Sequence, residues 1–313
     1  MEFDLGCVFS AAFPQFGTDE RGLSSELMAT LETGMFKAVE LAEVRDPAER
    51  RGVKSILGGT QTKCVFLGGM TIIREGLNLS SLDETTRGAA VNRLSELMDD
   101  AEDLGAVLFL ISSGPDPGER LREQALDQLG RSVSALCRHA QEIASGQPMT
   151  VTLEHYDRRI HRRFLLGPSS ETAKFAHIIR QEHPNFGITL DQSHLAQLGE
   201  IPSAALRDLR QAVCHVHLAN CLICDESNPL YGDLHPPFCI DDGEVGVEEI
   251  SSFLSALRED GYLGRAMPYG RPIVSIEVRN PDSADPRMTL QEAVKVVMSG
   301  YSLYHARNGR NQI

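Results

Sequence analysis

Short apolar runs alternate with amphipathic stretches along nearly the whole chain. Several runs are apolar without interruption, as in Ala106–Ile111, which is typical of strands buried on both faces of a parallel sheet. Between the runs, segments such as Asp83–Leu104 and Gly118–Ser145 place apolar side chains at helical spacing. The pattern predicts eight strands, over Phe3–Ser10, Lys37–Glu43, Lys63–Ile73, Ala106–Ser113, Met149–His155, Phe186–Asp191, Val213–Ala219 and Pro272–Val278.

Strands and helices in this alternation predict an α/β fold, a (β/α)8 TIM barrel, as a single domain over residues 1–313. A doubly wound sheet is the alternative, but its first crossover would carry G-x-G-x-x-G, and Ala11–Arg21 has no such sequence. Residues 220–246 form the one long irregular stretch, and we expect an active-site loop there. A shorter insertion is expected over Gly261–Arg271.

Composition narrows the classes of partner. The 313 residues carry a formal net charge of −14 and no Trp, which argues against a nucleic-acid partner. No apolar run approaches the roughly 18 residues that a membrane span needs, so no membrane contact is expected. The N-terminal segment Met1–Asp4 is acidic where a signal peptide would be basic, and the seven scattered Cys indicate reduced thiols. Both features predict a cytoplasmic location.

Ionisable side chains stand where four consecutive predicted strands end. They are Glu154, Asp191, His217 and Glu277. Because active sites of such barrels lie at the carboxyl ends of the strands, we expect these four side chains to converge. The alternative is that each forms an isolated salt bridge at its own strand end.

The chemistry of the set points to a divalent cation. Three neighbouring carboxylates would raise one another's pKa, and a bound dication removes that conflict. The ligands are oxygen atoms and one imidazole, without a thiolate, which favours Mn²⁺ first, or Mg²⁺, over structural Zn²⁺. Co²⁺ and catalytic Zn²⁺ remain open.

These residues and their surroundings resemble the xylose-isomerase-like barrel superfamily of sugar isomerases and epimerases, which also contains the endonuclease IV repair nucleases. The resemblance covers nearly the whole chain. It is most specific in Leu153-Glu154, Leu190-Asp191-Gln-Ser-His194, His215-Val-His217, Ile276-Glu277 and Asp242-Gly-Glu-Val-Gly246.

The resemblance implies an enzyme of carbohydrate metabolism with one divalent metal held by Glu154, Asp191, His217 and Glu277. Glu154 and Glu277 would also move a proton next to a sugar carbonyl through a metal-stabilised enediolate, and His194 is a further candidate for returning that proton. Epimerisation, isomerisation and elimination share this first step. The substrate, a free sugar, sugar phosphate or glycoside, stays open.

Two departures from the pattern carry information. Endonuclease IV proteins add histidines after strands three and four, where this chain has Gly68-Gly69-Met70 and Ser112-Ser113-Gly114. It does keep Gly232-Asp233-Leu-His235, which resembles theirs. Asp233 and His235 are therefore expected to contact substrate hydroxyls, or with His194 to hold a second metal.

The length of the loop after His217 is similar to that in catalytic subunits of bacterial C-glycoside deglycosidases. This similarity gives the alternative function, a lyase that eliminates from a 3-oxo-glycoside together with a small partner subunit. A homo-oligomer is the other expected assembly. A non-catalytic sugar-binding subunit is a third hypothesis, although opposed carboxylates around a metal serve no purpose in a pure binder.

Five further side chains lie near the predicted site. Arg158 follows Glu154 by four residues on the rim and is a candidate substrate contact, as is Asn220 at the start of the loop. His215 is expected to face away from His217. Cys221-Leu-Ile-Cys224 lacks the second pair that a zinc site needs, so packing is the preferred interpretation.

Overall fold

The computed structural model describes residues 1–281 and 284–309; residues 282–283 and 310–313 of the expected domain lie outside the described part. The predicted (β/α)8 barrel is confirmed, because parallel strands close into a ring in which the last pairs with the first. The strands are β1 (Asp4–Val8), β2 (Ala38–Leu41), β3 (Lys63–Leu67), β4 (Ala106–Ser112), β5 (Thr150–Glu154), β6 (Phe186–Asp191), β7 (Val213–Ala219) and β8 (Ile273–Glu277).

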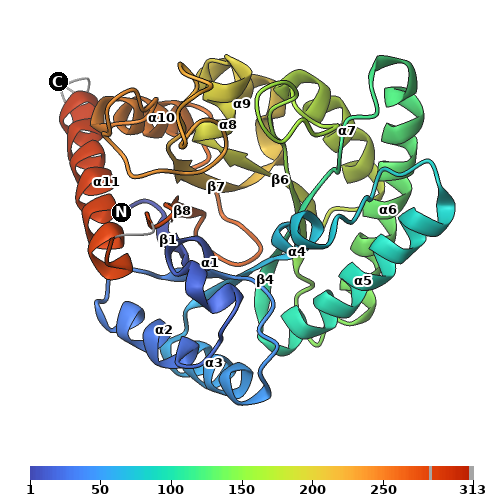
Figure 1. Cartoon of the computed structure of the whole chain (residues 1–313), viewed down its shortest axis with the longest axis horizontal. Helices are drawn as coiled ribbons and strands as arrows, with labels where there is room; N and C mark the ends of the chain where they lie inside the picture. Colours follow the sequence, from blue (N-terminus) through green and yellow to red (C-terminus); the bar gives the residue numbers. More distant parts are fainter. Residues whose placement is uncertain (282–283, 310–313) are drawn as a thin grey trace.

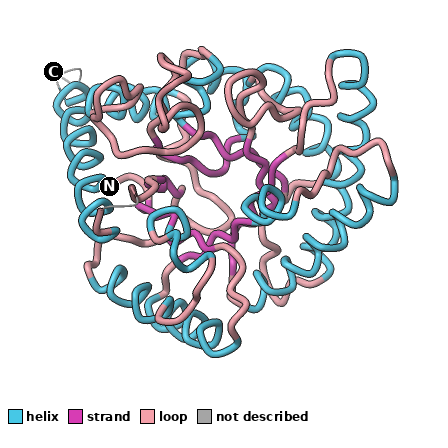
Figure 2. Tube along the Cα trace, viewed as in Figure 1, coloured by secondary structure: helices cyan, strands magenta, loops and turns pink. Residues whose placement is uncertain are grey.

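Helices surround this barrel (Figures 1 and 2). They are α1 (Phe9–Ala12), α2 (Leu23–Glu32), α3 (Pro47–Thr60), α4 (Gly68–Glu75), α5 (Glu84–Asp103), α6 (Arg122–Glu142), α7 (Ser169–Glu182), α8 (Gln192–Leu198), α9 (Pro202–Leu209), α10 (Val247–Glu259) and α11 (Pro286–Gly309). Short 3₁₀ turns occur at η1 (Pro14–Gly17), η2 (Glu119–Leu121) and η3 (Arg210–Ala212). In Figure 1 the long helices form the outer ring, and α1 and α4 lie inside it.

Each strand is buried on both faces, which explains its continuous apolar sequence. In β4, Phe109 and Ile111 belong to the large cluster that the strands form with the helices. Leu108 and Leu110 belong to a second, smaller cluster that also takes residues from β1, β2 and β3. Alternate side chains of one strand thus serve the outer layer and the barrel interior.

The predicted strand Lys63–Ile73 is too long, because β3 ends at Leu67 and α4 begins at once with Gly68. A Cβ atom at Gly68 would lie 2.7 Å from the ring of Phe109, so only glycine lets the helix start this close to β4. A short apolar run reads alike in a buried strand and a buried helix, which accounts for the error.

The predicted long loop joins β7 to α10, and the shorter insertion precedes β8. All seven cysteines are free, as expected; Cys224 and Cys239 are exposed and the others buried. Among the described helices, none combines the length and apolarity needed to cross a membrane.

Candidate metal centre

The structure brings together the four side chains predicted as metal ligands. One potential ligand atom from each of Glu154, Asp191, His217 and Glu277 lies within 4.8 Å of the others. His217 stands in the middle, with Nδ1 at 2.9 Å from Glu277 Oε2 and 3.2 Å from Glu154 Oε1. Its distance to Asp191 Oδ2 is 3.6 Å. Strands β5 to β8 therefore each contribute one side chain to a single point at the carboxyl end of the barrel.

Asp191 is oriented by the helix that follows it. It is the N-cap of α8, and Oδ1 accepts from the backbone N–H and the hydroxyl of Ser193, both at 2.6 Å. Its Oδ2 is buried and has no hydrogen-bond partner among the residues that the structure describes. A buried carboxylate oxygen without a donor is costly unless something positive faces it. The cap thus fixes one oxygen and directs the other toward His217.

Glu154 is held by a neighbour from its own segment. The Tyr156 hydroxyl donates to Glu154 Oε2 at 2.6 Å, which leaves Oε1 facing His217. The Tyr156 ring packs on His194, with ring centroids 4.3 Å apart. Sequence reasoning did not single out Tyr156, although an aromatic residue two positions after a strand-end carboxylate is a usable signal.

Glu40 of β2 is a second residue that the sequence analysis missed. It is fully buried inside the barrel, and its two oxygens lie 3.1 and 3.2 Å from Nε2 of His217. Hydrogen-bonding one imidazole nitrogen to a carboxylate fixes the orientation of the ring and the nitrogen left for a metal. Glu40 therefore presents Nδ1 of His217 to the three carboxylates.

His215 does not face away from His217, and that expectation is wrong. Residues two apart in a strand share a face, so both imidazoles point into the barrel, with ring centroids 4.7 Å apart. His215 Nε2 lies 3.0 Å from Glu40 Oε1, and Nδ1 lies 3.2 Å from Thr189 Oγ1. His215 thus extends the polar network one layer below the candidate metal position.

The charges of the centre shift the ionisation of its members. Burial opposes ionisation of Glu154, but His217 and His194 outweigh it and lower the pKa of that carboxyl. Burial likewise opposes protonation of His217, yet Glu40, Glu277 and Glu154 raise its pKa well above the usual value. Protons on the histidines thus balance the carboxylates, and a divalent cation would compete with those protons.

His194, Asp233 and His235 form a second group beside the first. His194 Nε2 lies 2.8 Å and His235 Nε2 3.2 Å from Asp233 Oδ1, while Arg162 Nε donates to Asp233 Oδ2 at 2.5 Å. Against burial, Asp191 and Asp233 raise the pKa of His194 to about 10. His194 is buried, its Nδ1 lies 3.7 Å from Glu154 Oε1, and it is not among the residues that line the cavity described below.

The backbone of His235 has an unusual conformation for a residue other than glycine. Its φ is 47°, in the left-handed region, and its Nε2 lies 3.5 Å from Glu277 Oε1. Such strained conformations of residues other than glycine are concentrated at functional sites. Asp233 and His235 both line the cavity described below, as a substrate contact requires.

Two predicted substrate contacts are contradicted by their hydrogen bonds. Arg158 turns its guanidinium to Glu171, with Nη1 and Nη2 donating at 3.0 and 2.8 Å. Asn220 is fully buried: its amide donates to Pro237 O, and its carbonyl accepts from the N–H groups of Cys221 and Val245. Both side chains hold loops, and Arg162 takes the place at the cavity that was predicted for Arg158.

The Cys221–Cys224 pair is not arranged as a metal site. Cys221 is buried with Sγ 3.4 Å from Ser193 O, whereas Cys224 is exposed with Sγ 3.9 Å from Asp242 O. The packing interpretation from the sequence agrees with the burial of Cys221 but not with the exposure of Cys224.

A cavity of about 400 Å³ opens above the centre. Glu154, His217 and Glu277 form part of its wall on one side, and Phe9, Leu41 and Leu110 belong to the other. Its volume lies within the range usual for small-molecule sites, about 300–1,000 Å³.

The residues present suit a divalent cation. Three carboxylates and one imidazole converge, Asp191 Oδ2 is buried without a donor, and His217 has one nitrogen fixed by Glu40. Oxygen-rich sets with a single imidazole are typical ligands of Mn²⁺, Mg²⁺ and catalytic Zn²⁺.

Solved structures with the same fold include several sugar epimerases. D-Psicose 3-epimerase from Clostridium cellulolyticum H10 has a TM-score of 0.67 at 16% identity, covering 96% of this chain and 99% of its own. A 3-keto-D-glucoside 4-epimerase from E. coli has 0.66 at 15% identity, covering 95% and 99%. An IolI protein with a bound zinc atom has 0.67 at 14% identity, covering 96% and 99%. Likeness at such identities shows the fold alone.

Among curated proteins, no sequence matches the chain significantly. A family model does match, over residues 28–297, and it describes a xylose isomerase-like TIM barrel. That span includes the strands β2 to β8 and the four residues of the candidate metal centre. The chain therefore belongs to the xylose isomerase-like TIM barrel family.

Proposed function

We propose that this chain is a divalent-metal-dependent sugar isomerase or epimerase that removes a proton from carbon next to a sugar carbonyl. The observation that carries the proposal is the pair Glu154 and Glu277, which meet at one candidate metal position and both face the cavity. Two carboxylates beside one bound sugar can divide the removal and return of a proton between them. The sugar epimerases among the structures of like fold support the same class.

In this proposal each side chain of the centre has a separate chemical role. Glu277, whose side chain is 15% exposed, has the freer carboxylate and takes the proton. Glu154, held by Tyr156 and protonated beforehand, donates a second proton to the carbon, while Glu277 keeps the one it took until solvent removes it; His194 lies behind Glu154 and positions it. Asp233, His235 and Arg162 bind substrate hydroxyls. A bound divalent cation supplies positive charge where the carbonyl oxygen becomes negative.

Elimination from a 3-oxo-glycoside begins with the same proton removal and is the second candidate. One structure of like fold is described as a 3-keto-D-glucoside 4-epimerase, so sugars with a carbonyl at carbon 3 deserve a place among the substrates tested. The product distinguishes the outcomes: epimerisation keeps the glycosidic bond, and elimination breaks it.

The test is solvent deuterium incorporation into ketoses and 3-oxo-glycosides by Mn²⁺-loaded protein, followed by mass spectrometry. The Glu277→Gln variant keeps one ligand oxygen but removes the base, so exchange at saturating Mn²⁺ should fall by about 10²–10⁴-fold. Glu171→Gln is the matched control, because Glu171 pairs with Arg158 away from the centre, and it should exchange normally. Metal binding without exchange for any substrate would instead favour the sugar-binding hypothesis.

A further inference from the structure

The two halves of the barrel mouth differ in chemistry. Strands β5 to β8 end in the ionisable side chains of the candidate metal centre. The other half, following β1 to β4, lines the same cavity with apolar groups, including Phe9, Leu41, Leu67 and Leu110. Ser10, Glu43, Arg45 and Arg74 also line this half, and the last three are ion-paired. The side chains of the candidate metal centre that line the cavity all lie in the other half.

Three phenylalanines after β1 form an aromatic surface in this apolar half. Phe9 and Phe13 are buried with ring centroids 4.6 Å apart, and Phe16 stacks on Phe9 at 6.0 Å with an interplanar angle of 7°. All three line the cavity, and Phe16 remains partly exposed. Aromatic side chains presented in this way offer a stacking partner for a further ring.

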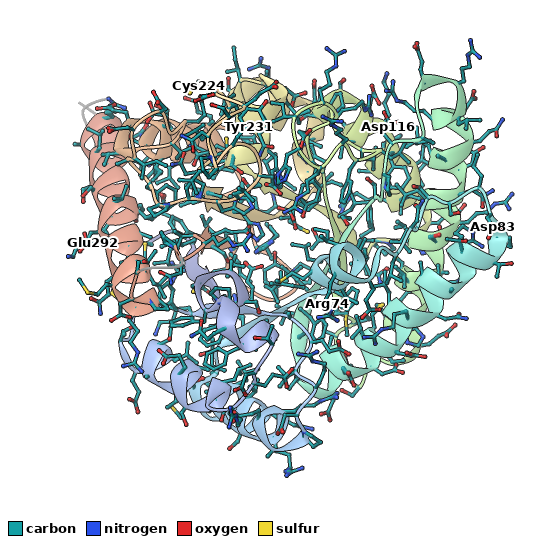
Figure 3. The ribbon with its side chains drawn as sticks, in the orientation of Figure 1. Arg74, Asp83, Asp116, Cys224, Tyr231 and Glu292 are labelled. Atoms are coloured by element: carbon teal, nitrogen blue, oxygen red, sulfur yellow. The ribbon has the colours of Figure 1, made fainter. Side chains whose placement is uncertain are left out.

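Helix α4 contributes exposed apolar side chains to the same cavity. Met70 is 40% and Ile73 39% exposed, and both line the cavity wall. Arg74, at the end of α4, lies near the middle of the view in Figure 3, whereas Asp83 and Glu292 lie on the outer ring. An exposed apolar surface continuous with a functional cavity marks a binding surface, unlike single exposed residues elsewhere.

The charges around the apolar half do not favour a phosphate. Four arginines line the cavity, and three are paired with carboxylates: Arg45 with Glu20 at 2.9 Å, Arg74 with Glu43 at 2.9 Å and Arg162 with Asp233 at 2.5 Å. A phosphate would have to displace these partners. A second sugar unit would bring hydroxyls to a mostly apolar wall, on which Glu43, Arg45 and Arg74 are already ion-paired. Each buried hydroxyl without a partner is costly.

We propose that the substrate is a sugar carbonyl compound bearing an apolar ring, with the sugar at the metal centre and the ring on Phe16, Met70 and Ile73. An aryl glycoside oxidised in its sugar ring belongs to this class. The inference rests on the proposed function for the position of the sugar. It goes beyond that function by separating such conjugates from free sugars and sugar phosphates.

The experiment compares phenyl and methyl 3-oxo-β-D-glucopyranoside with the Mn²⁺-loaded full-length protein. Dissociation constants come from calorimetry, and deuterium incorporation is measured on the same samples. The phenyl probe should bind about tenfold or more tightly than the methyl probe, a typical effect of filling an apolar pocket. Phe16→Ala and Ile73→Ser should each reduce this preference about fivefold or more, with little effect on the methyl probe.

Ile178→Ser is the matched control, because Ile178 is 64% exposed on α7 and lies outside this cavity. It should keep the full preference for the phenyl probe. The molar mass of each variant in solution, measured by light scattering, distinguishes ligand binding from self-association. Loss of an oligomer in Phe16→Ala or Ile73→Ser would assign the apolar surface to a second copy of the chain and overturn the inference.

The remaining outcomes separate the two proposals. Equal affinity for both probes, a preference that survives both substitutions, or binding of neither probe would each overturn the inference. Exchange of deuterium into both probes alike would still support the proposed function. Conversely, tight phenyl binding that depends on Phe16 but occurs without exchange would support the apolar subsite and count against the proposed function.

Discussion

Glu40 shows how one buried carboxylate can control a metal ligand from the opposite wall of a barrel. Its carboxylate contacts both His215 and His217. None of the polar contacts described above joins it to Glu154, Asp191 or Glu277. Burial opposes its ionisation, but the two histidines outweigh burial and lower its pKa. An ionised Glu40 therefore keeps a proton on Nε2 of His217 and leaves Nδ1 as the ligand.

Removing that charge should weaken metal binding without removing a ligand. Glu40→Gln keeps the size of the side chain, and we expect Mn²⁺ affinity to fall about 10–100-fold, the usual effect of losing a partner behind a metal ligand. Titration calorimetry measures the affinity, and the ¹⁵N chemical shifts of His217 report which nitrogen carries the proton. A structural role alone would leave those shifts unchanged.

Glu102→Gln serves as the control, since Glu102 binds Ser145 on the outer surface. Its Mn²⁺ affinity should stay within about twofold of the unmodified protein. If Glu40→Gln binds Mn²⁺ equally well, then Glu40 stabilises only the fold of the barrel interior.

The four candidate ligands were predictable because each stands at or near the end of a predicted strand, and parallel strands end at one edge of the barrel. Glu40 was not, because its partner His217 lies 177 residues away in sequence and no local pattern links the two. The sequence analysis placed Arg158 at the cavity, where the structure has Arg162. The reason is the shape of their loop, in which the Asp157 carboxylate accepts from the N–H groups of Ile160, His161 and Arg162. No periodicity reports a turn of this kind.

The loop over residues 220–246 is organised from a single side chain at its start. Asn220 links three separate points of the loop, at Cys221, Pro237 and Val245. The loop in turn carries Asp233 and His235 to the cavity. Sequence pattern located the loop through its missing periodicity, but it gave Asn220 the wrong role, because a buried amide and a substrate-binding amide look alike in sequence.

Asn220→Ala should loosen this loop while the barrel stays folded. Two buried N–H groups, of Cys221 and Val245, and the half-buried carbonyl of Pro237 lose their partner. A buried group left unpaired costs about 1–3 kcal/mol, so the unfolding temperature should fall by several degrees. Limited proteolysis should cut within residues 220–246 faster than in the unmodified protein. Asn228→Ala removes only one local bond, to the N–H of Leu230, and should change neither measurement appreciably. Equal proteolysis of both variants would contradict the anchoring role of Asn220.

The barrel as a whole concentrates opposite charges around the candidate metal centre. Five carboxylates, Glu40, Glu154, Asp191, Asp233 and Glu277, lie close to His194, His217, His235 and Arg162. Carboxylates raise the pKa of the histidines, and these in turn lower the pKa of Asp191 and Asp233. Such a set is stable without metal only while protons remain on the histidines, so it should respond to metal and to pH together.

Metal binding should therefore stabilise the whole fold, and more strongly as pH rises. A cation that binds only the folded chain adds about 2.7 kcal/mol at a concentration of 100 times its Kd, which corresponds to an increase in Tm of about 5 °C. Because the pKa of His217 is raised in the metal-free protein and the ligand must be neutral, Mn²⁺ displaces a proton there. Affinity, and with it the increase in Tm, should grow from pH 6 to pH 8, by up to tenfold in affinity for each pH unit and proton released.

Asp191→Asn is the matched comparison, since asparagine can still cap α8 but leaves no negative charge at this position. Differential scanning calorimetry of both proteins with Mn²⁺ or EDTA should show the increase only in the unmodified chain. The same increase in Asp191→Asn, or one that shrinks as pH rises, would place the cation elsewhere in the molecule.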